Sequence, residues 1–199
     1  MVEIRDSIYR GREDFVYRLA VGELPFITGV FPLGARSGAK TAVQVSGWNL
    51  PVKRLTPDTR GKRGTELVSL AGSNAVPFAV DDLAEAPEKE PNDRRQAAQR
   101  VKLPVIVNGR IDRAGDTDWY RFEGKAGDEI VADVMARRLD SPVDSVLRLL
   151  DGAGKELAEN DDFDDHASPL QTHHADSHLA VKLPAGCLEA VGYLFNLIL

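Results

Sequence analysis

Residues 118–135 read Asp-Trp-Tyr-Arg-Phe-Glu-Gly-Lys-Ala-Gly-Asp-Glu-Ile-Val-Ala-Asp-Val-Met. Tyr120 and Phe122 alternate with polar or amphipathic side chains, which is the period of a half-buried β-strand. Residues 124–128 contain two glycines and an aspartate, as expected of a turn. Every second position from 129 to 135 is apolar again. This stretch therefore predicts two strands joined by a turn, and it favours an all-β fold.

The same alternation recurs along the chain on both sides of this stretch. Gly- and Asp-rich turns separate the segments, and no long helical period is present. Short strands at this spacing are typical of an antiparallel β-sandwich. The polar residues 94–100 are expected to form a brief helix with Asp93 as its N-cap. Further strands are expected at residues 105–111, 144–150, 155–158, 178–183 and 188–195.

Residues 25–80 carry a second, smaller set of strand patterns. Strands are expected around residues 27–30, 41–45, 66–70 and 76–80, separated by turns that contain Gly and Pro. A separate alternation covers residues 13–21 and places four side chains on one face of a strand, namely Phe15, Tyr17, Leu19 and Val21. This strand is expected either to close a preceding module or to add an edge to the next one.

Composition limits the possible classes of protein. The chain has 199 residues, of which 43% are hydrophobic and 28% charged, which is typical of a globular protein with one large or two small domains. No apolar run is long enough to span a bilayer, and the charged N-terminus has no signal-peptide core. The single cysteine, Cys187, excludes an intrachain disulfide and a cysteine-based zinc site.

Charge divides the chain into two unlike parts. Residues 1–80 carry 11 Lys and Arg against 7 Asp and Glu, a balance of +4. Residues 81–199 carry 14 against 24, a balance of −10. This asymmetry supports two modules, and the acidic part should repel nucleic acid and attract cations.

The acidic residues 88–93, Glu-Lys-Glu-Pro-Asn-Asp, lie where the composition changes. Alternation in an extended segment points Glu88, Glu90 and Asn92 the same way, and a second acidic group follows within residues 115–119. Carboxylates and Asn carbonyls are ligands that calcium prefers. The competing interpretation is a solvated acidic linker that ends in an N-capping aspartate.

Several spaced elements occur in a fixed order between residues 88 and 186. After the 88–93 motif come Asn-Gly-Arg-Ile-Asp-x-x-Gly-Asp-Thr-Asp-Trp-Tyr-x-Phe at 108–122, Lys-Ala-Gly-Asp at 125–128, Asp-Ser-Val-Leu-Arg-Leu-Leu-Asp-Gly at 144–152 and Leu-Pro-Ala-Gly at 183–186. Together they resemble a bacterial pre-peptidase C-terminal (PPC) domain. Upstream, Pro-Phe-Ile-Thr at 25–28 and Ser-Gly-Trp-Asn-Leu at 46–50 resemble the Ig-like fold of plexins and transcription factors (IPT/TIG).

The PPC resemblance implies a jelly-roll β-sandwich appended to secreted proteases and related to collagen-binding domains of clostridial collagenases. It implies calcium ligands that tie the linker to the sandwich, which by matching position are Glu88, Glu90, Asn92, Asp93, Asp116 and Asp118. The chain is expected to divide into four parts. Residues 1–24 would form a terminal or edge strand and residues 25–80 an Ig-like segment. Residues 81–104 would form an acidic linker and residues 105–199 a jelly-roll domain. The apolar sequence after Gly186 departs from the family pattern. One strand of the family fold is therefore expected to be missing or replaced there, as would follow from a truncated or frame-shifted reading frame.

Other candidate sites have less specific patterns. A second acidic group, residues 160–165 with Asp140, Asp144 and Asp176, is read either as a second cation site or, preferably, as a flexible loop. His173, His174 and His178 lack a zinc-site spacing. The basic residues between 53 and 63 are read as a loop tip in preference to a nucleic-acid contact, because no aromatic residues are interleaved.

No nucleophile or phosphate-loop motif is present, so the chain is not expected to be an enzyme. The preferred hypothesis is an accessory or binding module of a larger secreted protein, with Trp48 and Trp119 as candidate contacts for an extracellular polymer or matrix protein. The alternatives are a fragment of a secreted protease or other hydrolase, and a purely structural spacer. The expected location is extracellular, cell-surface or periplasmic, from the resemblance, with calcium as cofactor and other domains of the parent chain as partners.

Overall fold

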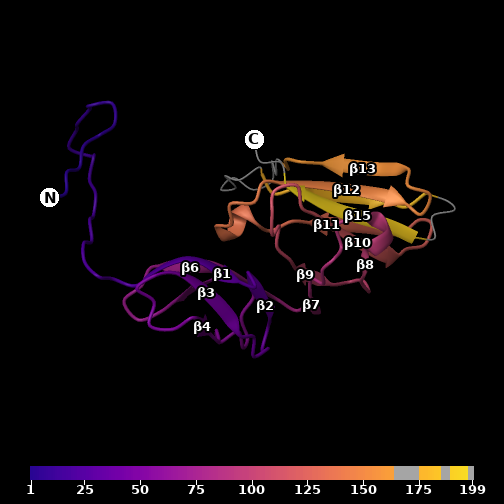
Figure 1. Ribbon diagram of the computed structural model, residues 1–199, viewed down its shortest axis with the longest axis horizontal. Coiled ribbons are helices and arrows are strands. Elements are labelled where there is room, and N and C mark those ends of the chain that lie inside the picture. The colour runs from indigo at the N-terminus through magenta and orange to yellow at the C-terminus, as the bar shows by residue number, and fades with distance from the viewer. Residues whose placement is uncertain (164–174, 185–188, 197–199) are drawn as a thin grey trace.

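The structure is a computed structural model that describes residues 1–163, 175–184 and 189–196, the last of these as backbone. The regular structure in these ranges is β, apart from two short 3-10 helices, η1 (Arg95–Ala97) and η2 (Arg137–Leu139). The predicted all-β class is therefore confirmed (Figure 1). Within the described ranges, no helix has the length and apolarity needed to cross a membrane.

Two small sheets face each other in the N-terminal part of the chain. One has the order β1-β3-β4 and the other β2-β6-β5. Their apolar side chains meet in a core that contains Val43 of β3 and Phe78 of β6, both fully buried. We call this unit the N-terminal sandwich. Its strands are β1 (Phe26–Phe31), β2 (Gly34–Arg36), β3 (Val43–Trp48), β4 (Arg54–Leu55), β5 (Gly64–Ser69) and β6 (Ala75–Asp81).

A larger unit, the C-terminal sandwich, follows from residue 85. A five-stranded sheet of order β13-β12-β15-β10-β8 packs against the pair β11-β14, and β7 pairs with β9. Phe122, Leu149, Leu179 and Leu183 form its buried core. Its strands are β7 (Glu85–Pro87), β8 (Gln99–Arg100), β9 (Ile106–Asn108), β10 (Thr117–Glu123), β11 (Glu129–Asp133), β12 (Ser145–Asp151), β13 (Glu156–Asn160), β14 (His178–Lys182) and β15 (Glu189–Asn196).

The atypical C-terminal sequence forms a central strand. β15 lies between β10 and β12 and pairs antiparallel with both, so that Tyr193 is opposite Trp119 on one side and Arg148 on the other. The strand expected over residues 188–195 therefore forms, as β15. Placement between two neighbours also removes the exposed edge that an unpaired apolar strand would leave.

Two local predictions are wrong. No strand forms over residues 13–21; Tyr17 and Leu19 are exposed, and the N-terminal residues run away from both sandwiches (Figure 1). Alternation alone does not create a strand, because the backbone also needs a neighbour to bond with. The helix expected over 94–100 shrinks to η1, whose N-cap is Arg94 and has no side-chain cap.

The antiparallel pattern expected from the sequence also has exceptions. Three short pairs, β2 with β6, β7 with β9 and β8 with β10, are parallel. Each joins two or three residues, a length at which sequence periodicity carries no information about strand direction.

We expect Phe78→Ala to lower the free energy of unfolding of the N-terminal sandwich by about 3–5 kcal/mol, because it removes a fully buried ring and leaves a cavity. Leu67→Ala, on the neighbouring strand β5, is the matched control, since Leu67 is 71% exposed and should change stability by no more than about 0.5 kcal/mol. Urea denaturation followed by circular dichroism measures both. Equal effects would contradict the assignment of this core.

Candidate metal site

Residues 88–93, which we call the strap, cross the C-terminal sandwich between β7 and η1. Backbone bonds hold the strap at both ends: the Glu88 N–H donates to the Asn108 carbonyl at 3.0 Å, and the Trp119 N–H donates to the Asn92 carbonyl at 3.0 Å. In the middle, the Lys89 N–H donates to Oε1 of Gln99 at 2.7 Å. These bonds place the strap beside the start of β10.

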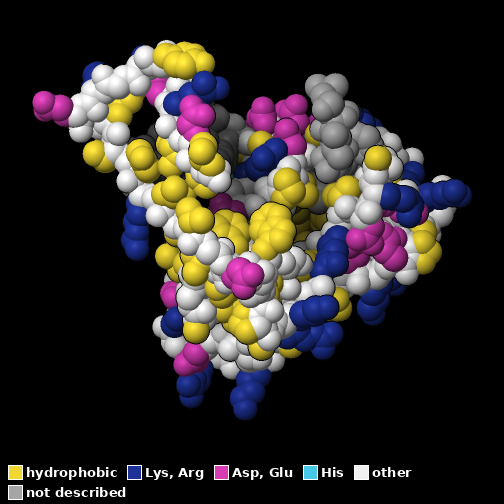
Figure 2. All heavy atoms as spheres, turned by 60° about the vertical axis from the view of Figure 1, so that its left-hand side comes forward, with side chains coloured by type: hydrophobic (Ala, Val, Ile, Leu, Met, Phe, Trp, Pro, Cys, Tyr) yellow, Lys and Arg dark blue, Asp and Glu magenta, His cyan; other side chains and the backbone are white. Residues whose placement is uncertain are grey.

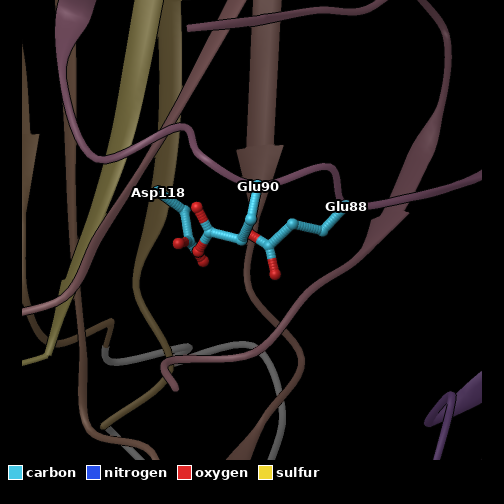
Figure 3. Close-up of side chains that lie close together, drawn as sticks. All are labelled: Glu88, Glu90 and Asp118. Carbon is cyan, nitrogen blue, oxygen red and sulfur yellow. The ribbon is translucent and has the colours of Figure 1, made fainter. Parts of the chain in front are cut away.

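Two overlapping groups of carboxylates result from this arrangement. Glu88 and Glu90 of the strap meet Asp118 of β10, and their side chains point toward one another in Figure 3. Glu90 also belongs to a second group, with Asp93 and Asp116. Within each group the candidate ligand oxygens lie within 4.8 Å of one another. Either group can hold a metal ion, and the strap and the strand each supply part of the ligand set.

Burial makes this collection of oxygens costly without a counter-charge. Asn92, Asp116 and Asp118 are 0%, 1% and 1% exposed. The Oδ1 atoms of these three residues and of Asp93 are buried without a hydrogen-bond partner. Buried polar atoms are normally paired, and an unpaired one costs about 1–3 kcal/mol, or more if it is charged. Four such oxygens in one place are a set of ligand atoms that could hold a metal ion.

The pKa of Asp118 also reflects the cost of placing several carboxylates together in a buried site. Burial raises the pKa of the Asp118 carboxyl to about 8, and the nearby carboxylates of Glu88, Asp116 and Glu90 act in the same direction. Without a cation, Asp118 therefore retains its proton near neutral pH. A bound metal ion would displace that proton, because metal ligands of this kind are ionised.

Asp116 has the opposite shift. Burial opposes its ionisation, but hydrogen bonds and the Arg113 charge outweigh burial and lower its pKa. The Asp112 N–H donates to Asp116 Oδ2 at 2.7 Å. An Arg113 Nη2 donates to Asp93 Oδ2 at 2.8 Å and lies 3.7 Å from Asp116 Oδ1. The protein itself thus partly neutralises the second group.

Glu88 is oriented by a set of donors that fix both of its oxygens. Its Oε1 accepts from the Tyr120 hydroxyl at 2.9 Å and from Asn92 Nδ2 at 3.0 Å, and its Oε2 accepts from the Arg110 N–H at 2.7 Å. The neighbouring Gly109 is necessary for this packing, because a Cβ there would lie 3.0 Å from Glu88 Oε2 and 3.1 Å from the Tyr120 hydroxyl. The site therefore depends on a close approach of backbone to carboxylate.

All six ligands expected from the sequence come together in the structure. They are Glu88, Glu90, Asn92, Asp93, Asp116 and Asp118. Sequence reasoning missed three supporting residues. Tyr120 shares a strand face with Phe122, yet its hydroxyl bonds Glu88, and no local sequence pattern marks Gly109 or Arg113 as part of the site. The Asn-Gly pair at 108–109 marks a turn in the sequence, but its closeness to Glu88 is a tertiary feature that no local pattern reveals.

The donor set fits a hard cation. Every candidate ligand is a carboxylate or an amide oxygen, and calcium takes six to eight such oxygens at about 2.3–2.6 Å. Softer metals prefer imidazole or thiolate ligands, which the six residues do not include. The same oxygens in a rigid octahedron would suit magnesium, but magnesium retains several waters and tolerates little departure from ideal geometry.

Among the other candidates from the sequence, Asp176 and His178 make structural contacts, and four residues lie outside the described part of the chain. Asp176 is 2% exposed, accepts the N–H groups of Ala136, Arg137 and Arg138, and also accepts from Arg138 Nε, so it anchors η2. His178 lies 3.1 Å from an Asp133 oxygen. His173, His174, Asp164 and Asp165 lie outside the described residues.

In the basic segment, three side chains pair with acidic neighbours: Arg60 with Asp58, Lys62 with Glu66, and Arg63 with Asp82. These pairs agree with a solvated loop, and they leave fewer charges for a phosphate backbone.

The two tryptophans proposed for a binding surface differ in exposure. Trp48 is 65% exposed and its ring lies 6.1 Å from that of Phe26, which is 49% exposed. Figure 2 shows apolar side chains gathered on the face that carries the N-terminal sandwich. Trp119 is half-buried within β10. Trp48 is therefore the more accessible of the two.

We expect Asp118→Asn to stabilise the protein in chelator at pH 8 and to weaken its response to calcium. In the metal-free wild type the Asp118 pKa rises from 3.8 to about 8 on folding, so the unfolded chain releases this proton at a lower pH than the folded one. The contribution of this carboxyl to stability is thus lost progressively as pH rises between these two values.

Melting curves of both proteins at pH 5 and pH 8, with chelator and with calcium, measure this difference. If the Asp118→Asn protein in chelator is less stable than wild type at pH 8, the prediction is wrong. Asp118 would then be an ordinary structural hydrogen-bonding group.

No family of known domains matches the chain. A probable subtilase-type serine protease of Deinococcus radiodurans is 36% identical over 107 residues. The match covers 52% of this chain and 14% of that protease, so the similarity concerns a small region of a much longer relative. The chain is thus similar to part of a larger protease.

Proposed function

We propose that this chain is a non-catalytic accessory module of a larger secreted bacterial protein, and that calcium staples its strap to the C-terminal sandwich. The observation that carries this proposal is the group of four buried oxygens without a hydrogen-bond partner, on Asn92, Asp93, Asp116 and Asp118. Two come from the strap, one from Asp116 immediately before β10 and one from Asp118 within β10, so an ion between them ties the segments together.

Calcium is the favoured ion because the ligands are all oxygens and most of them lie on the strap, whose lack of regular secondary structure tolerates irregular coordination. Weak calcium sites of extracellular modules work at about 10⁻⁴–10⁻³ M. A site that competes with a proton on Asp118 and with Arg113 belongs to this weaker class. Such a site would be filled outside the cell, which supports a secreted location.

The accessory role rests on two observations. The protease from Deinococcus radiodurans is similar over only 14% of its length, a share that leaves ample room for a separate catalytic domain. The chain contains no Gly-x-Ser-x-Gly and no phosphate-loop motif. The order of the motifs between residues 88 and 186 supports a PPC-like jelly-roll, and exposed Trp48 beside Phe26 offers an apolar contact for a polymer or matrix protein.

We expect calcium at about a hundred times its dissociation constant to add about 2.7 kcal/mol to the stability of the full chain. Glu90→Gln should abolish most of this gain, because Glu90 belongs to both carboxylate groups. Glu23→Gln makes the same change at an exposed carboxylate outside both acidic groups and serves as the matched control. Thermal melting with calcium and then with excess chelator measures the effect; equal gains in Glu90→Gln and wild type would contradict the assigned site.

A second experiment distinguishes an accessory binding module from the two alternatives, a protease fragment and a structural spacer. The purified chain, loaded with calcium, should not hydrolyse casein, and it should be retained on collagen, chitin or cellulose. Trp48→Ala should reduce retention, while Leu67→Ala, at another exposed apolar residue, should not. Casein hydrolysis would favour the protease fragment, and absence of both hydrolysis and retention would favour a structural spacer.

A further inference from the structure

The segment 13–21 has the alternation of a strand but does not pair with a sheet in the described part of the chain. Phe15, Tyr17, Leu19 and Val21 occupy alternate positions, and Tyr17 and Val21 are 72% and 70% exposed. The segment has no regular secondary structure and runs away from both sandwiches (Figure 1). Its backbone and its apolar side chains are therefore both accessible, as in an extended segment that pairs with the open edge of a sheet.

The next strand in the chain, β1, is closed to this segment. Asn74 covers its outer edge: Oδ1 of Asn74 accepts from the Ile27 N–H at 2.7 Å, and Nδ2 donates to the Ile27 carbonyl at 2.9 Å. Asn74 thus bonds both backbone groups of Ile27, as an added strand would. The edge strands β2 and β4 have only three and two residues. β5, with six residues, is the remaining edge strand of the N-terminal sandwich.

A cleft of about 300 Å³ runs along β5. One wall consists of residues 55–59 and Lys62, and the other consists of the four consecutive residues 66–69. Successive side chains of a strand point to opposite faces, so four in a row indicate that the edge of the backbone forms this wall. The buried core residues Phe78 and Val80 also line the cleft. The cleft therefore combines the edge of a strand with apolar surface.

Opposite charges favour one direction of pairing between the segment and β5. The segment begins with Glu13 and Asp14, and Lys62 and Arg63 immediately precede β5. The side chains of Lys62 and Arg63 are 44% and 77% exposed, so each can approach a further carboxylate besides its partner within the chain. A parallel arrangement with Glu13 beside Lys62 places both acids next to both bases. An antiparallel arrangement would move the acids to the other end of β5.

The same parallel alignment also matches the apolar residues. Counting along both strands with this offset places Leu19 beside Val68 and Val21 beside Leu70. Val68 and Leu70 pack against the core of the N-terminal sandwich. Because paired residues of neighbouring strands point to the same face, the exposed apolar side chains of the segment would be directed toward this core.

We propose that residues 13–21 of one copy of this chain add as a parallel strand to β5 of a second copy, and that the reciprocal contact closes a twofold dimer. Each copy supplies one segment and one cleft, so two identical contacts form and both are satisfied. A second copy is the partner because the segment extends away from the sandwich to which it is attached (Figure 1). The dimer does not depend on the proposed calcium site.

Sedimentation velocity of the full chain over a range of concentrations measures this association. We expect a monomer–dimer equilibrium that Leu19→Pro with Ala20→Pro weakens about tenfold or more. Successive N–H groups point to opposite edges of a strand, so one of the two prolines removes a donor to β5. Ser7→Pro with Ile8→Pro makes the same change at exposed residues outside the segment and should have no effect.

A complementary variant blocks the cleft and leaves the segment intact. Thr56 is exposed in the cleft wall, and Thr56→Trp should also weaken the dimer by filling the space. An equal mixture of Thr56→Trp with the paired-proline variant should form heterodimers, because one protein supplies the segment and the other supplies the cleft. Each variant alone lacks one of the two parts and should stay monomeric at the same concentration.

A disulfide tests the alignment directly. Ala20 and Ser69 are both exposed and become direct neighbours in the proposed pairing, at a separation that a disulfide can bridge. In a Cys187→Ser background, Ala20→Cys with Ser69→Cys should give a covalent dimer on a non-reducing gel after mild oxidation. Ala20→Cys with Thr65→Cys, near the other end of β5, is the matched control and should not.

Three outcomes would overturn the inference. The first is a chain that stays monomeric at every concentration. The second is a disulfide within one chain, because the segment would then lie on its own sandwich. The third is a dimer that survives the paired prolines, because another surface would then form the interface. None of these outcomes concerns calcium binding, so the proposed function is tested separately.

Discussion

The structure depends on the neutralisation of a buried group of acidic side chains. Asp116 and Asp118 are almost fully enclosed where the strap crosses the start of β10, and Glu90 faces both of them. Charges removed from water must be paired, protonated or bound to a metal. The protein uses a proton on Asp118 and the guanidinium of Arg113 for part of this, and four buried oxygens still lack a hydrogen-bond partner.

β10 is the strand through which this constraint acts on the rest of the C-terminal sandwich. It pairs with β15 and β8, and its residues Asp118, Tyr120 and Phe122 alternate along one face. One face of a single strand thus carries a candidate ligand, the donor that orients Glu88 and a core ring. Core packing and the acidic site therefore share this strand.

The sequence predicted much of this, because the relevant information is local. Period-two patterns located most strands to within a few residues, and the resemblance of residues 88–122 to a PPC domain implied that the acids of 88–93 and 116–118 form one oxygen-rich site. Sequence patterns did not predict the features that depend on contacts between residues far apart in the chain. The strand expected over 13–21 has no partner to bond with, and Asp93 contacts Arg113 and caps no helix. The support of Glu88 by Tyr120 depends on chain crossings that no window of sequence contains.

The most direct test of the central claim is a crystal structure of the full chain grown with calcium, with anomalous scattering used to locate the ion. We predict a peak between the strap and β10, about 2.3–2.6 Å from oxygens of Glu90 and Asp118 and of at least some of the four unpartnered groups. A well-ordered strap without such a peak, and with Asp118 still protonated, would contradict the account and assign the acidic cluster to proton and arginine pairing alone.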